Sequence, residues 1–491
     1  RRDPYPMPVT KLLIANRGEI AIRIARAAGD LGIPTVAVHS TDDANSLHPR
    51  MADEARALPG SGVAAYLDQD AIVAAAREAG CDAIHPGYGF LAERGDFARA
   101  CAAAGLTFVG PDPDHLDLFG DKARARAAAI AAGVPVIAGL DRAVTLAEAR
   151  DFLAAHGAII VKAVAGGGGR GTRAVTSADD LDAAFARCQS EARAAFGRED
   201  VYVERFIQRA RHVEVQILGD RAGAIAHLGE RECSVQRRFQ KIVEIAPAPN
   251  LDGGLRDRII DAAVRFARAV GYGNLGTFEF LVDAATNDFV FIEANARLQV
   301  EHTVTEAVTG VDLVQAQIRL AQGAALADLG LDDPAIARPR GFAIQTRVCL
   351  ETVAPDGSIR PAGGTLAAYE APSGPGIRTD GFGYTGYRTS GSYDSLLAKV
   401  IAHAPGPRFA DAVARATRAL SEFRLDGVGS NIPFLRAILA RPDFAAGAVH
   451  TRWLDEHMAA LATAAAEIRP RHAEAATPAR HVDAAAPAPT G

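Results

Sequence analysis

The chain has 491 residues, of which 49% are hydrophobic and 23% charged, and this length suits about three domains. The balance is typical of a globular protein, and the formal net charge of −6 provides no general attraction to nucleic acid or to an anionic membrane. The longest apolar run, residues 127–140, contains Gly133 and Pro135 and is shorter than the roughly 18 residues that a membrane span requires. We therefore expect neither nucleic acid nor a membrane among the partners.

Cysteine usage indicates the compartment. No two of the five cysteines form a C-x-x-C pair, which argues against a disulfide framework or a zinc site. The stretch RRDPYPMPVT has no apolar region of the kind found in a signal peptide. Both observations favour a reducing environment, and we expect a cytoplasmic protein.

Lysine is rare in this chain. Lys and Arg together number 53, but only five are lysines: Lys11, Lys122, Lys162, Lys241 and Lys399. Either cation serves on an exposed surface, so a chain that favours Arg should keep Lys where a compact point charge is needed. The alternative is that the five lysines are present by chance, and the sequence around each lysine must distinguish the two explanations.

The first part of the chain alternates strands with helices. KLLIANRGEIAIRIARAAGDLG predicts a strand, a turn at residues 16–18 and an amphipathic helix. TVAVHS and AIHPGYGF predict further strands, and DQDAIVAAAREAG predicts a helix. Such alternation produces a parallel, doubly wound sheet, so residues 8–115 are expected to form a Rossmann-like α/β domain.

The rest of the chain is expected to fall into four parts. A helical connector, residues 116–134, leads into a small α+β lid, residues 135–205. Longer strands of antiparallel character, among them residues 224–228, then build a C-terminal mixed-sheet region over residues 206–458. The Ala- and Pro-rich residues 459–491 are expected to be an extended linker to a further domain.

The lid contains the glycine-rich stretch AGGGGRGT. Its glycines satisfy the dinucleotide-binding pattern G-x-G-x-x-G, and they match a P-loop except that Thr172 replaces the Lys. Both of those loops lead directly into a helix whose N-terminus binds phosphate, whereas here the β-like segment TRAV follows. We therefore predict a hairpin tip, whose consecutive glycines suit a lid that closes over phosphates with backbone N–H groups. A plain flexible loop is the alternative.

Two glutamates lie in the apolar stretch TFEFLVDAATNDFVFIEANARLQVEH. It places Glu279 and Glu293 on two strands joined by a turn at residues 287–288. Each carboxylate is expected to be isolated in a mostly buried sheet, which is costly without a partner. Together with Asn295 they supply the oxygen ligands that Mg²⁺ prefers. The alternative is the surface alternation of an amphipathic strand.

A basic segment, ERECSVQRRFQK, collects Arg231, Arg237, Arg238 and Lys241 around Gln236. A solvated face is the simplest interpretation of a basic run. The rare lysine and the absence of helical periodicity favour a functional segment instead.

In order, these stretches resemble biotin carboxylase, the ATP-grasp component of biotin-dependent carboxylases, over residues 10–458. The matching motifs are IANRGEIAIRI, HPGYGFLAE, GDKARAR, VKAVAGGGGRGT, RHVEVQ, ERECSVQRRFQKIVE, FEFL, FIEANARLQVEH and SYDSLLAK. QRRFQK combined with NARLQVEH is highly specific within ATP-grasp enzymes. The resemblance implies an ATP-grasp fold and a ligase that makes carboxybiotin from ATP, bicarbonate and biotin through carboxyphosphate.

The resemblance also implies which residues bind the nucleotide and its metal. The nucleotide contacts are Lys122 and Lys162 at the phosphates, Gly166, Gly167, Gly168 and Gly169 in the lid, Glu204 on the adenine side, His212 and Gln236 chiefly at the ribose, and Leu281. The ligands of Mg²⁺ or Mn²⁺ correspond to Glu279 and Glu293, supported by Asn295.

For the chemistry, Lys241 and Arg297 correspond to the residues that hold bicarbonate near an anionic phosphate. Glu301 corresponds to the general base that deprotonates bicarbonate. Arg347 corresponds to the arginine that stabilises the biotin enolate, because positive charge stabilises a developing oxyanion. Lys399 lies in a matching motif without clear ligand geometry and is interpreted as structural.

The sequence departs from the family at Phe239, where His is common, which removes one polar contact to the nucleotide. The family's carrier domain displays biotin on a Lys in a Met-Lys-Met-like turn, and no methionine here adjoins a Lys. Biotin is therefore expected on a carrier domain that, with a carboxyltransferase, lies on another chain or beyond the linker. A homodimer or larger assembly is expected.

Two other functions stay open on sequence grounds. Another ATP-grasp ligase that activates bicarbonate, such as half of a carbamoyl phosphate synthase, shares the pattern E-x-N-x-R after a strand. The second alternative function is that of a catalytically silent domain serving as an assembly platform. The intact set of site residues argues against it.

Overall fold

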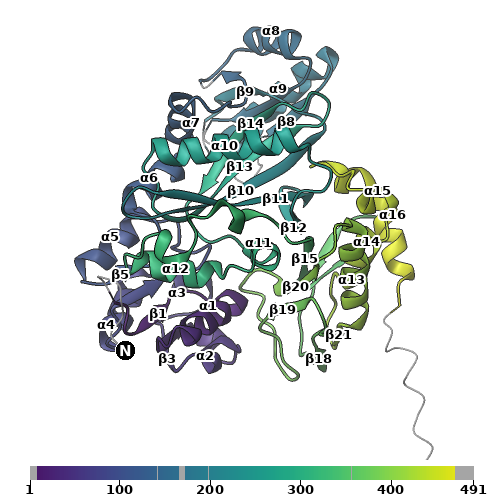
Figure 1. The fold of residues 1–491 in the computed structure, drawn as a ribbon. Coiled ribbons are helices and arrows are strands. Elements are labelled where there is room, and N and C mark those ends of the chain that lie inside the picture. The colour runs from purple at the N-terminus through teal and green to yellow at the C-terminus, as the bar shows by residue number, and fades with distance from the viewer. Residues whose placement is uncertain (1–7, 141, 165–171, 197, 355, 470–491) are drawn as a thin grey trace, which may run out of the picture.

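A computed structural model describes residues 8–140, 142–164, 172–196, 198–354 and 356–469 (Figure 1). Three larger sheets of five, four and eight strands organise these residues, together with two small two-stranded sheets. Within the described ranges, no helix is both long enough and apolar enough to cross a bilayer.

The N-terminal part is a doubly wound parallel sheet, as the alternating pattern predicts. Its strands lie in the order β3-β2-β1-β4-β5, and each neighbouring pair is parallel. The elements are β1 (Leu12–Ile14), α1 (Gly18–Asp30), β2 (Thr35–His39), α2 (His48–Met51), β3 (Glu54–Ala57), α3 (Gly62–Leu67), α4 (Gln69–Glu78), β4 (Ala83–His85), α5 (Gly95–Ala103) and β5 (Thr107–Phe108). The apolar stripe of α1, with Ile20 and Ile24, is buried in the core, as its helical spacing requires.

Two connector helices lead to a four-stranded sheet of order β6-β9-β7-β8 at the top of Figure 1. The elements are α6 (Pro113–Gly120), α7 (Lys122–Ala131), β6 (Gly139–Leu140), α8 (Leu146–His156), β7 (Ile159–Ala163), β8 (Thr172–Val175), α9 (Ala178–Phe196) and β9 (Val201–Arg205). Strands β7 and β8 pair antiparallel, with Lys162 opposite Thr172, so the predicted hairpin is confirmed. The lid glycines Gly166, Gly167, Gly168 and Gly169 lie outside the described residues.

An eight-stranded sheet of order β14-β13-β10-β11-β12-β15-β20-β19 dominates the remainder, and its neighbouring strands are antiparallel. Its strands are β10 (Ala210–Gly219), β11 (Ile225–Arg237), β12 (Gln240–Ala246), β13 (Asn274–Asp283), β14 (Phe289–Asn295), β15 (Phe342–Cys349), β19 (Ile377–Gly381) and β20 (Leu396–Ala404). The strand predicted at residues 224–228 in fact continues to Arg237. The basic segment is thus itself a hairpin, turning at Arg238 and Phe239, which both have positive φ.

The strands β10 and β13 have one apolar and one polar face. Helix α10 (Gly253–Ala269), which crosses in front of the sheet in Figure 1, packs on the apolar face, where Val213, Val215 and Phe278 are buried. The alternate residues in the middle of the same strands are polar, and Glu214 lies opposite Glu279 in the register. Period-two alternation therefore places His212, Glu214, Gln216, Thr277 and Glu279 on the face away from α10.

The C-terminal helices cover the other end of the sheet. The remaining elements are α11 (His302–Thr309), α12 (Leu313–Ala321), β16 (Glu351–Val353), β17 (Ile359–Pro361), β18 (Ala368–Glu370), α13 (Phe409–Glu422), β21 (Arg424–Asp426), α14 (Ile432–Leu439), α15 (Pro442–Ala445) and α16 (Trp453–Glu467), with short 3₁₀ turns at Thr41–Asp43, Ala327–Leu329 and Pro334–Ala337. Helices α13, α14 and α16 share one apolar cluster with β15 and β20.

One difference from the sequence prediction concerns residues 459–491, expected to be an extended linker. Helix α16 continues to Glu467, nine residues into that segment. Alanine has the highest helix propensity, and Leu461, Ala462 and Ala465 of the added turns are buried. Residues 470–491 lie outside the described part of the chain.

Candidate active site

Lys241 lies at the centre of the polar face. From β12 its Nζ contacts carboxylate oxygens of Glu214 at 2.6 Å, Glu301 at 2.7 Å and Glu279 at 3.2 Å. Burial lowers the pKa of Lys241, but the three carboxylates outweigh burial and raise it well above its usual value. Glu214 and Glu279 are directly opposed on β10 and β13, an arrangement of like charges that is unfavourable without a shared cation.

Glu301 lies at the N-terminus of α11 and is buried between two cations. Its Oε1 accepts from Lys241, and its Oε2 accepts from Nη2 of Arg347 at 3.1 Å. Burial raises the pKa of Glu301, but Lys241 and Arg347 outweigh it and hold the pKa well below its usual range. The side chain is therefore an ionised carboxylate fixed in one orientation, and position is the first requirement of a general base.

Arg347 reaches the site from β15. Besides Glu301 it contacts Glu244 of β12, with 2.5 Å between Arg347 Nε and Glu244 Oε1. Arg347 lies opposite Lys399 in the β15–β20 register, and Glu244 is held in turn by Gln345 at 2.9 Å. Its guanidinium is thus oriented by two carboxylates.

Arg297 comes from the segment between β14 and α11. Its Nη1 donates to Gln299 Oε1 at 2.9 Å, and its Nη2 donates to Asn295 Oδ1 at 3.2 Å. Its Nε lies 3.4 Å from Glu93 of the N-terminal part. These contacts direct the guanidinium along the same polar face as Lys241.

The three predicted metal ligands meet on β13 and β14. Glu279 and Glu293 are directly opposed in the register, and Asn295 Nδ2 donates to Glu279 Oε1 at 2.5 Å. Adjacent carboxylate and amide oxygens on one face fit the donor set of Mg²⁺. The side chain of Glu293 is 43% exposed, whereas that of Glu279 is 1% exposed.

The expectation that both carboxylates are isolated is wrong for Glu279. Besides Lys241 and Asn295, Gln299 Nε2 donates to it at 2.8 Å, and His212 Nε2 lies 2.5 Å from its Oε2. Burial raises its pKa, but Lys241 and His212 outweigh burial and bring the pKa to about 2. The partners come from distant parts of the chain, so alternation along one strand could not indicate them.

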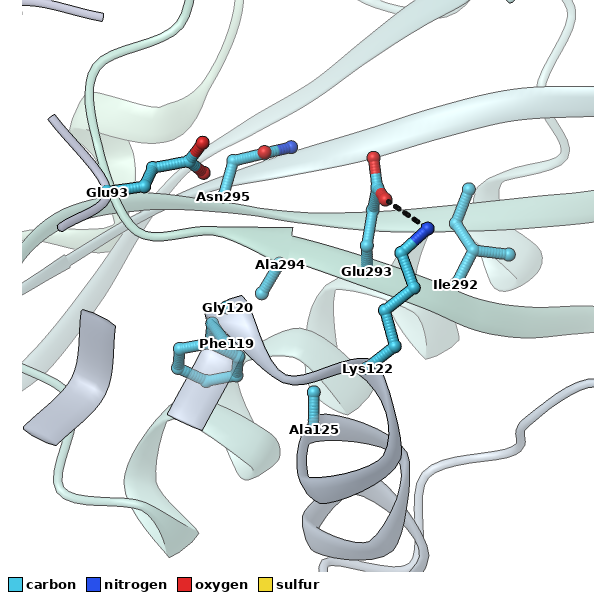
Figure 2. Close-up of a pocket in the computed structure, with 9 residues that line it drawn as sticks. All are labelled: Glu93, Phe119, Gly120, Lys122, Ala125, Ile292, Glu293, Ala294 and Asn295. Atoms are coloured by element: carbon cyan, nitrogen blue, oxygen red, sulfur yellow. Dashed lines mark ion pairs between the residues drawn. The ribbon is translucent and has the colours of Figure 1, made fainter. Parts of the chain in front are cut away.

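A pocket opens between the connector helices and β14 (Figure 2). Its lining residues are Glu93, Phe119, Gly120, Lys122, Ala125, Ile292, Glu293, Ala294 and Asn295. Figure 2 shows Lys122, the first residue of α7, extending toward Glu293, and its Nζ lies 4.0 Å from Glu293 Oε2. The Lys122 side chain is 88% exposed, so the ammonium is accessible to an anion.

The other predicted nucleotide contacts form two groups. On the four-stranded sheet, Lys162 of β7 forms an ion pair with Glu204 of β9. On the eight-stranded sheet, Gln236 Nε2 contacts His212 Nδ1 at 2.6 Å, and Leu281 lies opposite His212 in the register. The pocket residue Lys122 lies beside neither group in any contact that the structure records.

Sequence reasoning missed Glu214 and Glu244 of this network and named Arg231 only as part of the basic segment. Arg231 is fully buried, and its Nε lies 2.5 Å from Glu214 Oε1. A signal was present for the two glutamates, because each interrupts an apolar strand, HVEVQIL and IVEIA. A charged residue in a buried strand indicates a paired partner, although it does not say which.

Three models of known families match the chain in succession. The biotin carboxylase N-terminal domain matches residues 8–116, and the biotin carboxylase C-terminal domain matches residues 345–456. Between them, residues 121–329 match the ATP-binding domain of the carbamoyl-phosphate synthase L chain.

Curated relatives are pyruvate carboxylases. The mitochondrial enzyme of Mus musculus is 51% identical over 463 residues, which is 93% of this chain and 39% of the relative. The enzyme of Bacillus subtilis is 48% identical over 455 residues, which is 91% of this chain and 39% of the relative. The chain thus spans about two fifths of the length of these relatives.

Solved structures of biotin carboxylase domains match nearly end to end. The domain of a single-chain bacterial carboxylase is 49% identical with a TM-score of 0.82, over 93% of this chain and 99% of that one. The Hydrogenobacter thermophilus 2-oxoglutarate carboxylase domain dimer, in complex with MgADP, ADP and bicarbonate, is 41% identical with a TM-score of 0.84 over the same shares. With its parallel N-terminal sheet, its lid hairpin and its polar sheet face, this chain belongs to the biotin carboxylase family of ATP-grasp ligases.

Proposed function

We propose that the chain carboxylates biotin on a carrier domain, consuming ATP and bicarbonate and giving carboxybiotin, ADP and phosphate. This is the first half-reaction of a biotin-dependent carboxylase. The observation that carries the proposal is the continuous row of Arg347, Glu301, Lys241 and Glu279, in which each side chain contacts the next. The row joins a base, two cations and a metal-type carboxylate on one face of one sheet.

Each end of the row has a distinct task. At the metal end, Glu279, Glu293 and Asn295 would hold Mg²⁺ or Mn²⁺, which supplies charge neutralisation for the nucleotide phosphates. In the middle, Lys241 and Arg297 hold bicarbonate, and Glu301 removes its proton so that it attacks the γ-phosphate as a dianion. This attack gives carboxyphosphate and ADP.

At the other end, Arg347 stabilises the enolate oxygen of biotin when carboxyphosphate decomposes. Its two carboxylate partners fix the guanidinium in advance, so little reorganisation is needed as negative charge develops. Decomposition releases phosphate and CO₂, and the phosphate takes the N–H proton of biotin to leave the enolate. The biotin nitrogen then attacks the CO₂ carbon to form carboxybiotin, and protonated phosphate leaves as product.

The nucleotide is bound between the lid and the central sheet in this proposal. Lys122 and Lys162 contact the phosphates. Glu204 lies on the adenine side, His212 and Gln236 lie chiefly at the ribose, and Leu281 is a further nucleotide contact. The ion pair with Glu204 gives Lys162 a defined position before the phosphates arrive, while the exposed Lys122 stays accessible to them.

A carbamoyl-phosphate-synthase-like reaction is less consistent with these findings. The middle of the chain matches a model named after that enzyme, but both flanking models are biotin carboxylase domains. Arg347, the residue assigned to biotin, lies in the C-terminal match.

The partners in this proposal are a biotin carrier domain and a carboxyltransferase, on the same or a separate chain, in a homodimer or larger assembly. One similar structure is a biotin carboxylase domain dimer, and another is a single-chain, multi-domain long-chain acyl-CoA carboxylase. We propose a cytoplasmic location because all five cysteines are free thiols.

The experiment that tests the proposal is ATP hydrolysis with bicarbonate, measured with and without free biotin. Biotin-stimulated hydrolysis with carboxybiotin as product is expected. The Lys241→Ala and Arg297→Ala variants should still bind ATP but form no carboxybiotin. Hydrolysis that biotin fails to stimulate, or carboxylation retained in either variant, would sink the assignment.

A further inference from the structure

Lys399 of β20 is fully buried and has two partners. Its Nζ donates to the carbonyl oxygen of Val300 at 3.0 Å and lies 3.0 Å from Glu19 Oε2 of α1. Tyr88 donates its hydroxyl to the other oxygen of Glu19. An ammonium group that is 0% exposed is expensive unless both charge and hydrogen bonding are satisfied, and here each is satisfied by a different partner.

The position of the two partners connects Lys399 to the site. Val300 immediately precedes Glu301, and its carbonyl belongs to the peptide link between them. Lys399 lies directly opposite Arg347 on the neighbouring strand, so the two side chains leave the sheet on the same face. Arg347 contacts the carboxylate of Glu301, and Lys399 contacts the backbone one peptide earlier.

Two cations directly opposed on a sheet repel one another. Each therefore needs its own carboxylate, and the structure supplies Glu244 for Arg347 and Glu19 for Lys399. A pair of small apolar residues at positions 347 and 399 would avoid this repulsion. We infer that both cations are retained because both are needed at the Glu301 segment.

We propose that Lys399 is a positioning residue for the general base. It holds the Val300 carbonyl and so fixes the backbone from which the Glu301 side chain extends. The inference rests on the proposed function, in which Glu301 deprotonates bicarbonate. Glu19 supplies the counter-charge from the N-terminal part of the chain, and Tyr88 of the same part holds Glu19 by a hydrogen bond, which ties the base to that part as well. Displacement of a reacting group by about 1 Å is enough to cost about 100-fold in rate.

The experiment compares three variants of the full chain: Lys399→Met, the double variant Lys399→Met/Glu19→Gln, and Lys11→Met as a matched control. Lys11 has the same pair of partners, a carboxylate (Glu54, 2.5 Å) and a backbone carbonyl (Ala79, 2.8 Å), but far from the site. The double variant removes both buried charges together, so the test survives if the single variant fails to fold.

Two readouts are needed. The first is carboxylation of free biotin, with kcat normalised to the number of MgADP sites counted by calorimetry. The second is hydrogen exchange at the start of α11, where the amides of His302 and Val304 donate to the carbonyls of Gln299 and Glu301 at 3.3 Å. Loss of an anchor at Val300 should accelerate exchange there and leave other segments unchanged.

Both Lys399 variants are expected to lose about 100-fold in kcat. Their KM values for ATP and bicarbonate should stay unchanged, and exchange at the start of α11 should rise. Lys11→Met should match the wild type in both readouts. A double variant with wild-type kcat and exchange would overturn the inference, as would KM values that rise together with the loss of kcat. A wild-type chain that carboxylates no biotin would instead defeat the proposed function.

Discussion

Lys241 Nζ and Glu279 Oε1 lie 3.2 Å apart, so the proposed bicarbonate lysine and a proposed metal ligand share a contact. We expect Glu279→Gln and Glu293→Gln both to weaken Mg²⁺ binding by at least about tenfold, the effect of losing even an outer partner of a metal site. Only Glu279→Gln should also destabilise the fold, by about 1–3 kcal/mol, because it removes an ionised acceptor from buried donors.

Mg²⁺ titration of nucleotide binding and thermal unfolding would measure these two effects. Glu422→Gln, at an exposed ion pair with Arg418 on α13, is the control and should change neither. Equal destabilisation by Glu279→Gln and Glu293→Gln would contradict the difference in burial between the two carboxylates.

Removal of the proposed base should separate binding from chemistry. Glu301→Gln keeps the size of the side chain, but its amide has one acceptor oxygen and can accept from only one of Lys241 and Arg347. We expect bicarbonate and MgATP still to bind, while carboxylation slows by about 10²–10⁴-fold, the usual contribution of general base catalysis. Single-turnover carboxybiotin formation is the measurement, and a variant within a few-fold of the wild type would exclude Glu301 as the base.

Stability should decline toward acid because two buried histidines resist protonation in the folded chain. Burial lowers the pKa of His48 to about 4 and that of His85 to about 3, from 6.5. Below pH 6.5 the unfolded chain takes up protons that the folded chain refuses, so stability is present above that pH and lost below it. Each histidine contributes a loss of about 1.4 kcal/mol per pH unit down to its folded pKa.

Denaturation midpoints measured at pH 7.5 and 5.5 would show this slope. His48 Nε2 lies 3.1 Å from the Val38 carbonyl, and the amide of a His48→Gln variant can donate to the same oxygen. In that variant the free energy of unfolding should change less with pH, by the contribution of one histidine. An unchanged slope would mean that His48 is not neutral and buried as described.

The lid lysine offers a test of nucleotide binding alone. Lys162→Met should raise the KM for ATP by more than about tenfold, because a lysine at a phosphate acts as a point charge that a thioether cannot replace. Thermal stability should hardly change, because Lys162 is partly exposed beside Glu204. Arg150→Met, at the exposed pair with Asp182 on the same lid, is the control, and an equal effect in both variants would refute a specific phosphate contact.

Local patterns in the sequence predicted the elements well. The turn between Glu279 and Glu293, the hairpin around the glycines and the first strand–turn–helix unit each depend on residues close in the chain. Alternation also identified the buried face of β13. These features could be predicted because the hydrophobic periodicity of a strand (two residues) or of a helix (3.6 residues) can be recognised within a dozen residues.

The partners of the site residues could not be predicted in this way. Lys241 meets Glu214, Glu279 and Glu301 only because β12, β10 and β13 lie in one sheet whose order differs from the order in the chain. No local pattern encodes that order. The buried glutamates of β10 and β12 indicated that ionic partners exist, and the fold alone decides which partners they are.

The irregular register of β12 has a consequence for how this chain can change. Lys241 and Glu244 lie three residues apart, a spacing that would place them on opposite sides of a regular strand. They reach the same side because the β11–β12 register shifts between Lys241 and Val243, whereas Glu244 lies where β12 pairs regularly with β15. The separation between the bicarbonate group and the biotin group therefore depends on one extra residue in β12, and a variant that changes the separation can do so by altering that single irregularity while the pairing with β15 stays intact.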